Sequence, residues 1–226
     1  MTRIGGFVFP EKTTHVQCKM VEANSKVRKE VRIRSLLRAA SPSLLDERLQ
    51  ELQAAAEAFD HGGAALSLRP GEIHYGRRRS FEIAPQRRSL AAGVDLLIWT
   101  RDRYARSEIL HQDEGETHLS NARFSLFNRG NWTAPAHISL EAKSVIHTVK
   151  IETENETFSL NGEVNPGETL AVDSDNRAVE IDGRNAFASS NQLFPFLPPG
   201  ANLLRITLAP AGAEAHCRIT YRDVWV

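Results

Sequence analysis

Three acidic residues, Glu152, Glu154 and Glu156, are the nearest approach in this sequence to a catalytic acid–base pair. Glycosidases use two carboxylates that face each other across a cleft. These three glutamates alternate along one predicted strand edge, so their side chains share one face and cannot oppose each other. We therefore interpret them as a solvated face.

A second group, residues 173–176 with the sequence Asp-Ser-Asp-Asn, places several oxygen ligands close together, as calcium loops do. It lacks the glycine and the distal glutamate of an EF-hand, and it lies between two short predicted strands. The favoured interpretation is a turn in which Asp and Asn side chains bond to the local backbone.

Two arginine clusters, residues 77–79 and residues 87–88, could grip phosphate. A groove for single-stranded nucleic acid would also need interleaved aromatic residues, which are missing here. The clusters are better explained as solvated connections or as ion pairs between subunits.

The motifs that signal catalysis or cofactor binding are absent. The sequence has no Gly-x-Ser-x-Gly, no His-Glu-x-x-His and no Gly-x-Gly-x-x-Gly, and its eight histidines are scattered rather than grouped at metal-ligand spacing. Cys18 and Cys217 lie nearly the whole chain apart and form no disulfide framework. We expect neither an enzyme nor a bound cofactor or metal.

Composition narrows the class of partner. The 226 residues include 28 Lys and Arg and 28 Asp and Glu, so the formal net charge is zero, which argues against duplex DNA or an anionic membrane as a bulk electrostatic partner. No apolar run approaches the length that spans a bilayer, and no secretory signal begins the chain. We expect a soluble protein made in a cytoplasm.

The first part of the chain, residues 1–120, predicts a β domain, a sheet or barrel with one packed helix. Val31 and Ile33 alternate with Arg32 and Arg34, as in a strand with one apolar and one basic face. Ser41-Pro42 is a helix start signal, and Gly62-Gly63 is an end signal, which together predict a helix over residues 42–60. Its apolar positions recur at helical spacing, namely Leu45, Leu49, Leu52, Ala56 and Phe59.

The second part, residues 121–226, predicts an antiparallel β-sandwich. Short apolar runs alternate with turn signals such as Asn161-Gly162 and Asp182-Gly183, and no helical stretch follows Asn121. The mixed-charge segment before it, residues 101–118, suits an exposed loop. The last predicted strand, residues 217–226, either closes the sandwich or returns to the first domain.

Three segments of the second part resemble one known family in order and spacing. They are residues 124–138, which contain Gly130 and Pro135, residues 158–173, which contain Gly162 and Gly167, and residues 197–202, which read Leu-Pro-Pro-Gly-Ala-Asn. This pattern is similar to the C-terminal half of the distal tail (Dit) proteins of long-tailed bacteriophages. Residues 1–120 resemble that family only in layout.

The resemblance implies a structural role in the virion tail, in the tail tip or baseplate. N-terminal domains would form a ring, usually of six subunits, which continues the tail tube and joins it to the baseplate hub or tail-tip protein. Galectin-like sandwiches would project outward, DNA would pass through without specific binding, and assembly would take place in the host cytoplasm. The family brings no catalytic residues to this chain.

An alternative function is a carbohydrate-binding module, which would attach the sandwich to a host-surface glycan. Sugar rings usually stack on Trp or Tyr, and the sandwich region offers Trp132, Tyr221 and Trp225. Trp132, in the opening turn region, is the candidate glycan contact, and packing at the domain edge is the competing explanation.

Overall fold

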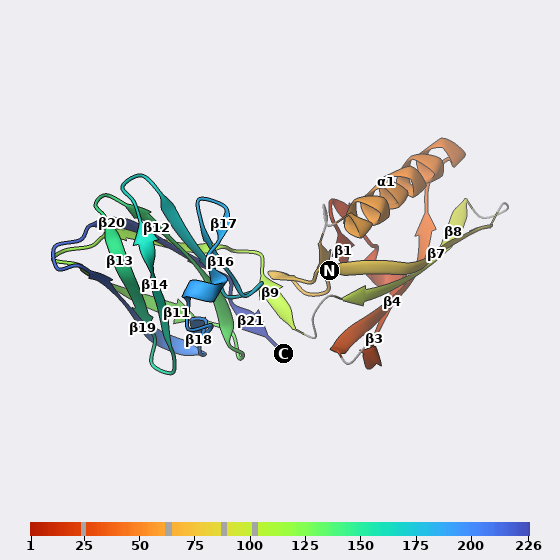
Figure 1. The fold of residues 1–226 in the computed structure, drawn as a ribbon. Helices are drawn as coiled ribbons and strands as arrows, with labels where there is room; N and C mark the ends of the chain where they lie inside the picture. Colours follow the sequence, from red (N-terminus) through yellow and green to blue (C-terminus); the bar gives the residue numbers. More distant parts are fainter. Residues whose placement is uncertain (24–25, 62–64, 87–89, 101–103) are drawn as a thin grey trace. The chain divides into compact units, whose positions relative to one another are not determined.

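The computed structural model describes residues 1–23, 26–61, 65–86, 90–100 and 104–226. The chain forms two compact units, Met1–Glu108 together with Val226, and Ile109–Trp225. The predicted mainly β fold is confirmed, with α1 as the one α-helix in the described residues (Figure 1). The prediction divided the chain twelve residues later, between 120 and 121.

The N-terminal unit has a four-stranded antiparallel sheet in the order β3-β4-β8-β7, and shorter strand pairs around it. Its elements are β1 (Arg3–Ile4), β2 (Phe7–Val8), the 3-10 helix η1 (Glu11–Thr13), β3 (Thr14–Ala23), β4 (Lys26–Arg38), α1 (Pro42–Asp60), β5 (Leu66–Ser67), β6 (Glu72–Ile73), β7 (Gly76–Gln86), β8 (Ala91–Thr100) and β9 (Ala105–Ser107). In β4, Val31 and Ile33 are buried while Arg32 and Arg34 are exposed, which confirms the predicted alternation.

Helix α1 spans the predicted residues. Pro42 begins it, and the Ser41 side chain accepts a hydrogen bond from the backbone N–H of Leu44 at 3.3 Å, as a helix cap should. The helix ends at Asp60, and Gly62-Gly63 lies outside the described residues. Figure 1 shows α1 lying across one face of the sheet.

The apolar stripe of α1 and the inner face of the sheet form the N-terminal core. Leu45, Leu52, Ala56 and Phe59 are buried, and Leu49 is half-buried against the same core. The sheet contributes apolar side chains from β4 and β8, namely Val31, Ile33, Leu37, Val94, Leu96 and Ile98. A helix with one apolar face therefore covers one apolar face of a sheet, as the sequence pattern predicted.

His74, between β6 and β7, predicts a pH dependence of the N-terminal unit. Its ring is buried, and burial, followed by the nearby charge of Lys29, lowers the pKa of His74 from 6.5 to about 4. Because the folded state holds the ring neutral, the unfolded chain binds more protons between these two values. Stability is therefore complete above about pH 6.5 and falls as the pH drops toward about 4.

We expect this histidine to remove about 2 kcal/mol of unfolding free energy by about pH 5. Urea unfolding of the wild type and of His74→Gln, each at neutral pH and at about pH 5, measures the effect, since the variant lacks the titrating ring. An equal loss of stability in both proteins would contradict the expectation.

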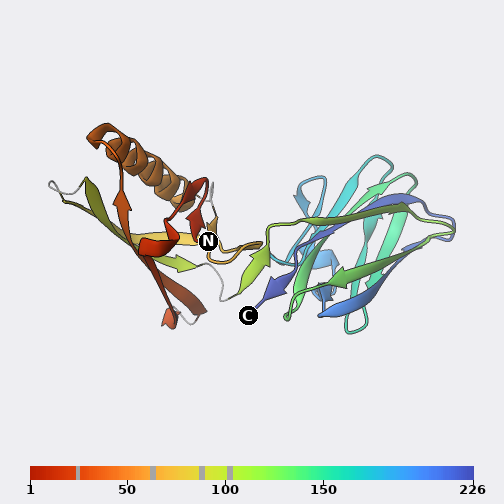
Figure 2. The ribbon, with the colours of Figure 1, turned by 180° about the vertical axis from the view of Figure 1, so that it is seen from behind.

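The C-terminal unit has two antiparallel sheets (Figure 2). Its elements are β10 (His111–Glu116), β11 (Asn121–Asn128), β12 (Ala134–Ala142), β13 (Ile146–Glu152), β14 (Thr157–Val164), β15 (Thr169–Asp173), β16 (Ala178–Ile181), β17 (Arg184–Asn185), the 3-10 helix η2 (Phe187–Ser189), β18 (Phe196–Leu197), β19 (Gly200–Ala209), β20 (Ala215–Tyr221) and β21 (Val224–Trp225). One sheet runs β10-β20-β12-β15-β16-β17, with β18 beside β12, and the other runs β11-β19-β13-β14. Buried and exposed residues alternate along β11, β19 and β20, as expected for strands with one face in a sandwich core.

The segment 101–118 differs from its prediction as an exposed loop. Residues 105–107 form β9, and residues 111–116 form β10, which pairs with β20 from His111↔Tyr221 to Glu116↔His216. The exposed side chains of β10 are Gln112, Glu114 and Glu116, so an edge strand with one charged face carries no apolar alternation to reveal it. At the other end of the chain, β20 closes the sandwich through its pairs with β10 and β12.

Candidate functional site

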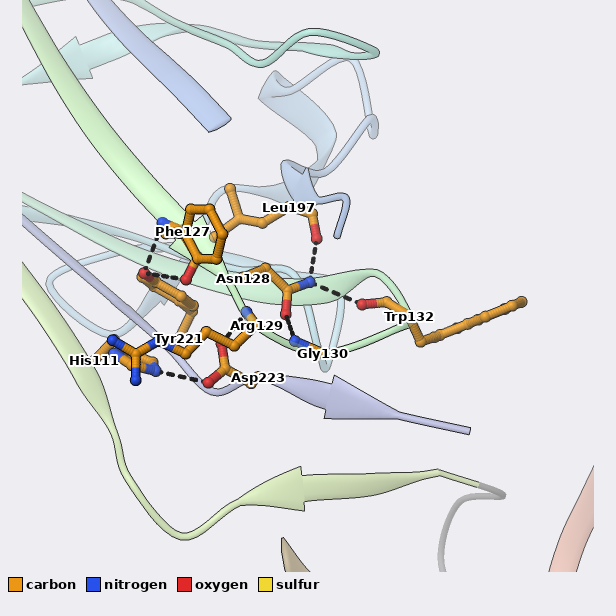
Figure 3. Close-up of polar contacts among 9 residues, drawn as sticks. All are labelled: His111, Phe127, Asn128, Arg129, Gly130, Trp132, Leu197, Tyr221 and Asp223. Atoms are coloured by element: carbon orange, nitrogen blue, oxygen red, sulfur yellow. Dashed lines mark hydrogen bonds and ion pairs between the residues drawn. The ribbon is translucent and has the colours of Figure 1, made fainter. Parts of the chain in front are cut away.

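The loop between β11 and β12 is organised by the side chain of Asn128, which ends β11 and is buried (Figure 3). Its Nδ2 donates to the carbonyl oxygen of Trp132 at 2.8 Å and to that of Leu197 at 2.9 Å. Its Oδ1 accepts from the backbone N–H of Gly130 at 2.9 Å. One buried amide therefore supplies partners for three backbone groups, which are costly to bury without them.

Asp223, just before β21, connects this loop to the first strand of the unit. Its buried carboxylate accepts from the backbone N–H of Arg129 at 2.9 Å, and its second oxygen lies 2.9 Å from Nε2 of His111 (Figure 3). No sequence motif links Asp223 to His111, because 112 positions separate them, so local patterns could not predict this pair.

Tyr221 supports the same network from β20. Its ring stacks on His111 with centroids 4.8 Å apart, and its hydroxyl donates to the carbonyl of Phe127 at 3.2 Å and accepts from the N–H of that residue at 3.1 Å. Burial raises the pKa of Tyr221 above its ordinary value, so the phenol stays neutral and keeps its donor.

Gly130 allows the loop backbone to lie directly against β21. A Cβ atom at this position would stand 2.0 Å from the carbonyl oxygen of Val224, far inside contact distance. The same oxygen accepts a hydrogen bond from the N–H of Trp132 at 3.1 Å. Only glycine permits this approach of two backbones.

Trp132, the candidate glycan contact, has a fixed backbone and a partly open side chain. Its N–H and its carbonyl are both bonded, and the indole is 40% exposed and points away from the polar network (Figure 3). An aromatic face of this kind can stack on a sugar ring. Its role as a glycan contact stays a prediction.

The other motif residues of the resemblance shape turns. Gly167 and Gly200 have φ of +86° and +97°, a left-handed backbone that favours glycine. Asn202 donates from its side chain to the carbonyls of Pro198 and Gly200, each at 2.9 Å, and so holds the corner before β19. These motif residues therefore determine the backbone geometry of turns.

The three glutamates considered as a catalytic acid–base pair, Glu152, Glu154 and Glu156, do not lie on one strand. Glu152 ends β13, whereas Glu154 and Glu156 lie in the turn to β14, so the prediction that all three follow one strand edge is wrong. The turn, residues 153–156, reads Thr-Glu-Asn-Glu and contains neither glycine nor proline, so the sequence did not indicate where the strand ends.

The predicted Asx turn is confirmed, since the Asp173 carboxylate accepts from the backbone N–H groups of Asp175 and Asn176, each at 2.9 Å.

The first arginine cluster lies in strand β7, so its prediction as a solvated connection is wrong. Nη2 of Arg78 forms an ion pair with Oδ2 of Asp60 in α1 at 2.8 Å, and the guanidinium of Arg79 lies 4.2 Å from the ring centroid of Trp99 in β8. Both arginines therefore have partners on neighbouring elements of the same unit. The second cluster, residues 87–88, lies outside the described residues.

Across the described part of the chain, no group of three or more His, Cys, Asp or Glu side chains is placed to hold a metal ion. In the same residues, no helix is long and apolar enough to cross a membrane. In the polar network of Figure 3, buried side chains form hydrogen bonds to backbone groups of separate segments and so hold these segments together.

Residues 129–225 match the family model of the siphovirus-type tail component, C-terminal domain. This domain belongs to that family. The match begins within the Asn128 loop and ends in β21, so it spans the network described above. The predicted resemblance to Dit proteins is confirmed over these residues, which match the C-terminal domain of a siphovirus-type tail component.

The fold of the whole chain is also similar to a solved structure. The crystal structure of the Dit protein (gp 19.1) of phage SPP1 aligns with a TM-score of 0.59 at 10% sequence identity, over 100% of this chain and 92% of that one. That protein is described as a paradigm of the hub adsorption apparatus in phages that infect Gram-positive bacteria. No curated protein sequence matches this chain.

Proposed function

We propose that this chain is a distal tail protein of the virion tail, whose N-terminal units associate into a ring, usually of six. The ring continues the tail tube on one side and binds the baseplate hub or tail-tip protein on the other, while galectin-like sandwich domains project outward. It is a structural function without catalysis. The family match and the likeness to SPP1 Dit support the tail assignment, and the edges of the N-terminal sheet support association between copies.

The N-terminal sheet has two long edges. Within the described residues, β3 pairs only with β4 and β7 pairs only with β8. Edge strands of 10 and 11 residues present unpaired backbone groups, which readily pair with another chain. Because the two edges differ, pairing of β3 with β7 of the next copy is head-to-tail, and such contacts form rings when the rotation closes.

Exposed apolar side chains on β3 are the observation that carries the ring proposal. Val16 pairs with Ile33 and Cys18 with Val31, so this side of β3 shares the face of the sheet that α1 covers. Yet Val16 is 37% exposed and Met20 is 52% exposed. The apolar face thus extends past the helix, as expected if a neighbouring copy completes the cover.

Charges placed on this strip should prevent ring formation. The double variant Val16→Glu, Met20→Glu would bury two unpaired carboxylates at each contact, which should weaken association at least about a hundredfold. Light scattering after size exclusion, with negative-stain images of the same fraction, measures the mass and shows whether rings with an open centre form.

The matched control is Leu119→Glu, Leu193→Glu, because both leucines are at least half exposed and lie in the C-terminal unit. It should assemble as the wild type does. A wild-type protein that stays monomeric at high concentration, both alone and with tail-tube protein added, would overturn the proposal.

The basic face of β4 is compatible with a channel that DNA crosses without specific binding. Arg32 and Arg34 both bond to Asp95 of β8, Arg32 through Nη2 at 2.6 Å and Arg34 through Nε at 3.1 Å. These hydrogen bonds, led by that of Arg32, lower the pKa of Asp95, so the carboxylate stays charged and offsets one of the two arginine charges. Their positive charge is therefore less available to phosphates.

A further inference from the structure

A hollow of about 270 Å³, with a lining of both apolar and polar groups, lies on the outer face of the sheet β10-β20-β12-β15-β16-β17 in the C-terminal unit. Its polar lining comes from four strands, with His137 and Ser139 from β12, Asp173 from β15, Glu180 from β16, and Arg218 and Thr220 from β20. The network of Figure 3 does not use these residues.

Strand register explains why the sheet is hollowed there. One row of neighbours across the sheet reads Arg218, Ser139, Ala171 and Glu180. Two short side chains therefore stand between two long ones, and side chains opposite each other in a sheet lie on the same face. The long arginine and glutamate form walls above a floor of small groups.

Two of the charged lining residues are already satisfied by the protein. The Asp173 carboxylate accepts from the turn that follows it and lies 3.3 Å from Nδ1 of His137. Arg218 donates from Nε to the Glu114 carboxylate at 2.7 Å. Neither charge is left over to attract an ion strongly.

Four other groups keep free hydrogen-bonding capacity. The hydroxyls of Ser139 and Thr220, the Nε2 atom of His137 and the carboxylate of Glu180 have no partner among the described residues. Together they can both donate and accept, because hydroxyls do both, a neutral imidazole does one or the other, and a carboxylate accepts.

We propose that this hollow binds a neutral saccharide, as one hexose unit of a host-surface glycan. Sugar hydroxyls both donate and accept, which matches the four free groups, and the small floor leaves room for a ring. The two carboxylates disfavour a phosphate, and an apolar peptide would cover the four polar groups without giving them partners. The volume lies just below that of ordinary ligand pockets, so we expect a small ligand and weak binding.

Saturation-transfer NMR on the full chain tests the proposal with three probes, the methyl glycosides of glucose, galactose and N-acetylglucosamine. At least one should bind, with a Kd of about 1–10 mM. Ala171→Phe should weaken this binding at least about tenfold, because it fills the hollow from an exposed floor position without removing a polar group. Glu180→Gln should weaken it less, since the amide still accepts a hydrogen bond.

Ala201→Phe is the matched control, because Ala201 is an exposed alanine of the other sheet, on β19, and the variant should bind as the wild type does. Trp132→Ala separates the hollow from the exposed indole and should also leave binding unchanged. Binding that survives Ala171→Phe, or that is lost in Trp132→Ala, would overturn the proposal. So would saturable binding of inorganic phosphate with none of the three glycosides. These readouts do not depend on ring formation.

Discussion

Leu52→Ala is expected to remove about 2–5 kcal/mol from the unfolding free energy of the N-terminal unit. Leu52 is fully buried on α1, in the core that the helix shares with β4 and β8. Removing its side chain loses apolar burial and leaves a cavity, and the rigid sheet below can close that cavity only in part.

Hydrogen exchange with mass spectrometry can localise this effect. Peptides from residues 1–108 should lose protection while those from residues 109–225 keep it, since the two units are separately compact. Leu44→Ala is the matched control, because Leu44 is 47% exposed on the same helix and should cost little. Equal protection in wild type and Leu52→Ala would mean that the helix stripe does not stabilise the unit.

Gly130→Ala is expected to destabilise the C-terminal unit by about 3 kcal/mol, the upper end of the usual cost of overpacking. The added Cβ would meet the Val224 backbone at 2.0 Å, and backbone cannot move aside as a flexible side chain can. The loop would have to leave β21, which would also break the bond from Trp132 to Val224 and disturb the three bonds of Asn128.

Gly162→Ala is the control for this substitution. It lies in β14 of the same unit, and a Cβ there would find its nearest neighbour at an ordinary 3.8 Å. Urea unfolding followed by hydrogen exchange should therefore show a large loss of protection around β21 for Gly130→Ala and a small one for Gly162→Ala. Similar losses in both would show that close approach is not what Gly130 provides.

The sequence predicted those elements whose signals are local. Helix α1 follows from a cap at Ser41, a proline at its first position and apolar residues at helical spacing. Strand β4 follows from the alternation of Val31 and Ile33 with arginines. Strand β10 gave no such signal, because its outward residues are all polar and its inward ones include a glycine.

The functional surfaces depend on register, which local patterns do not contain. Trp132 could be chosen from residue type alone, but its fixed backbone depends on Asn128 and on Val224 near the end of the chain. The hollow above Ser139 and Ala171 exists because these residues lie side by side on two neighbouring strands. In the sequence they are 32 positions apart. A small side chain carries no signal until its neighbours are known.

The bond between His111 and Asp223 brings the two ends of the C-terminal unit together. These residues lie close to the two ends of the C-terminal unit, which begins at Ile109 and ends at Trp225. The first and last strands of the unit are therefore held together by this bond, in which Nε2 of His111 lies 2.9 Å from Oδ2 of Asp223. A domain whose two ends meet in this way can be inserted into a chain, or removed from it, without separating the elements that flank it.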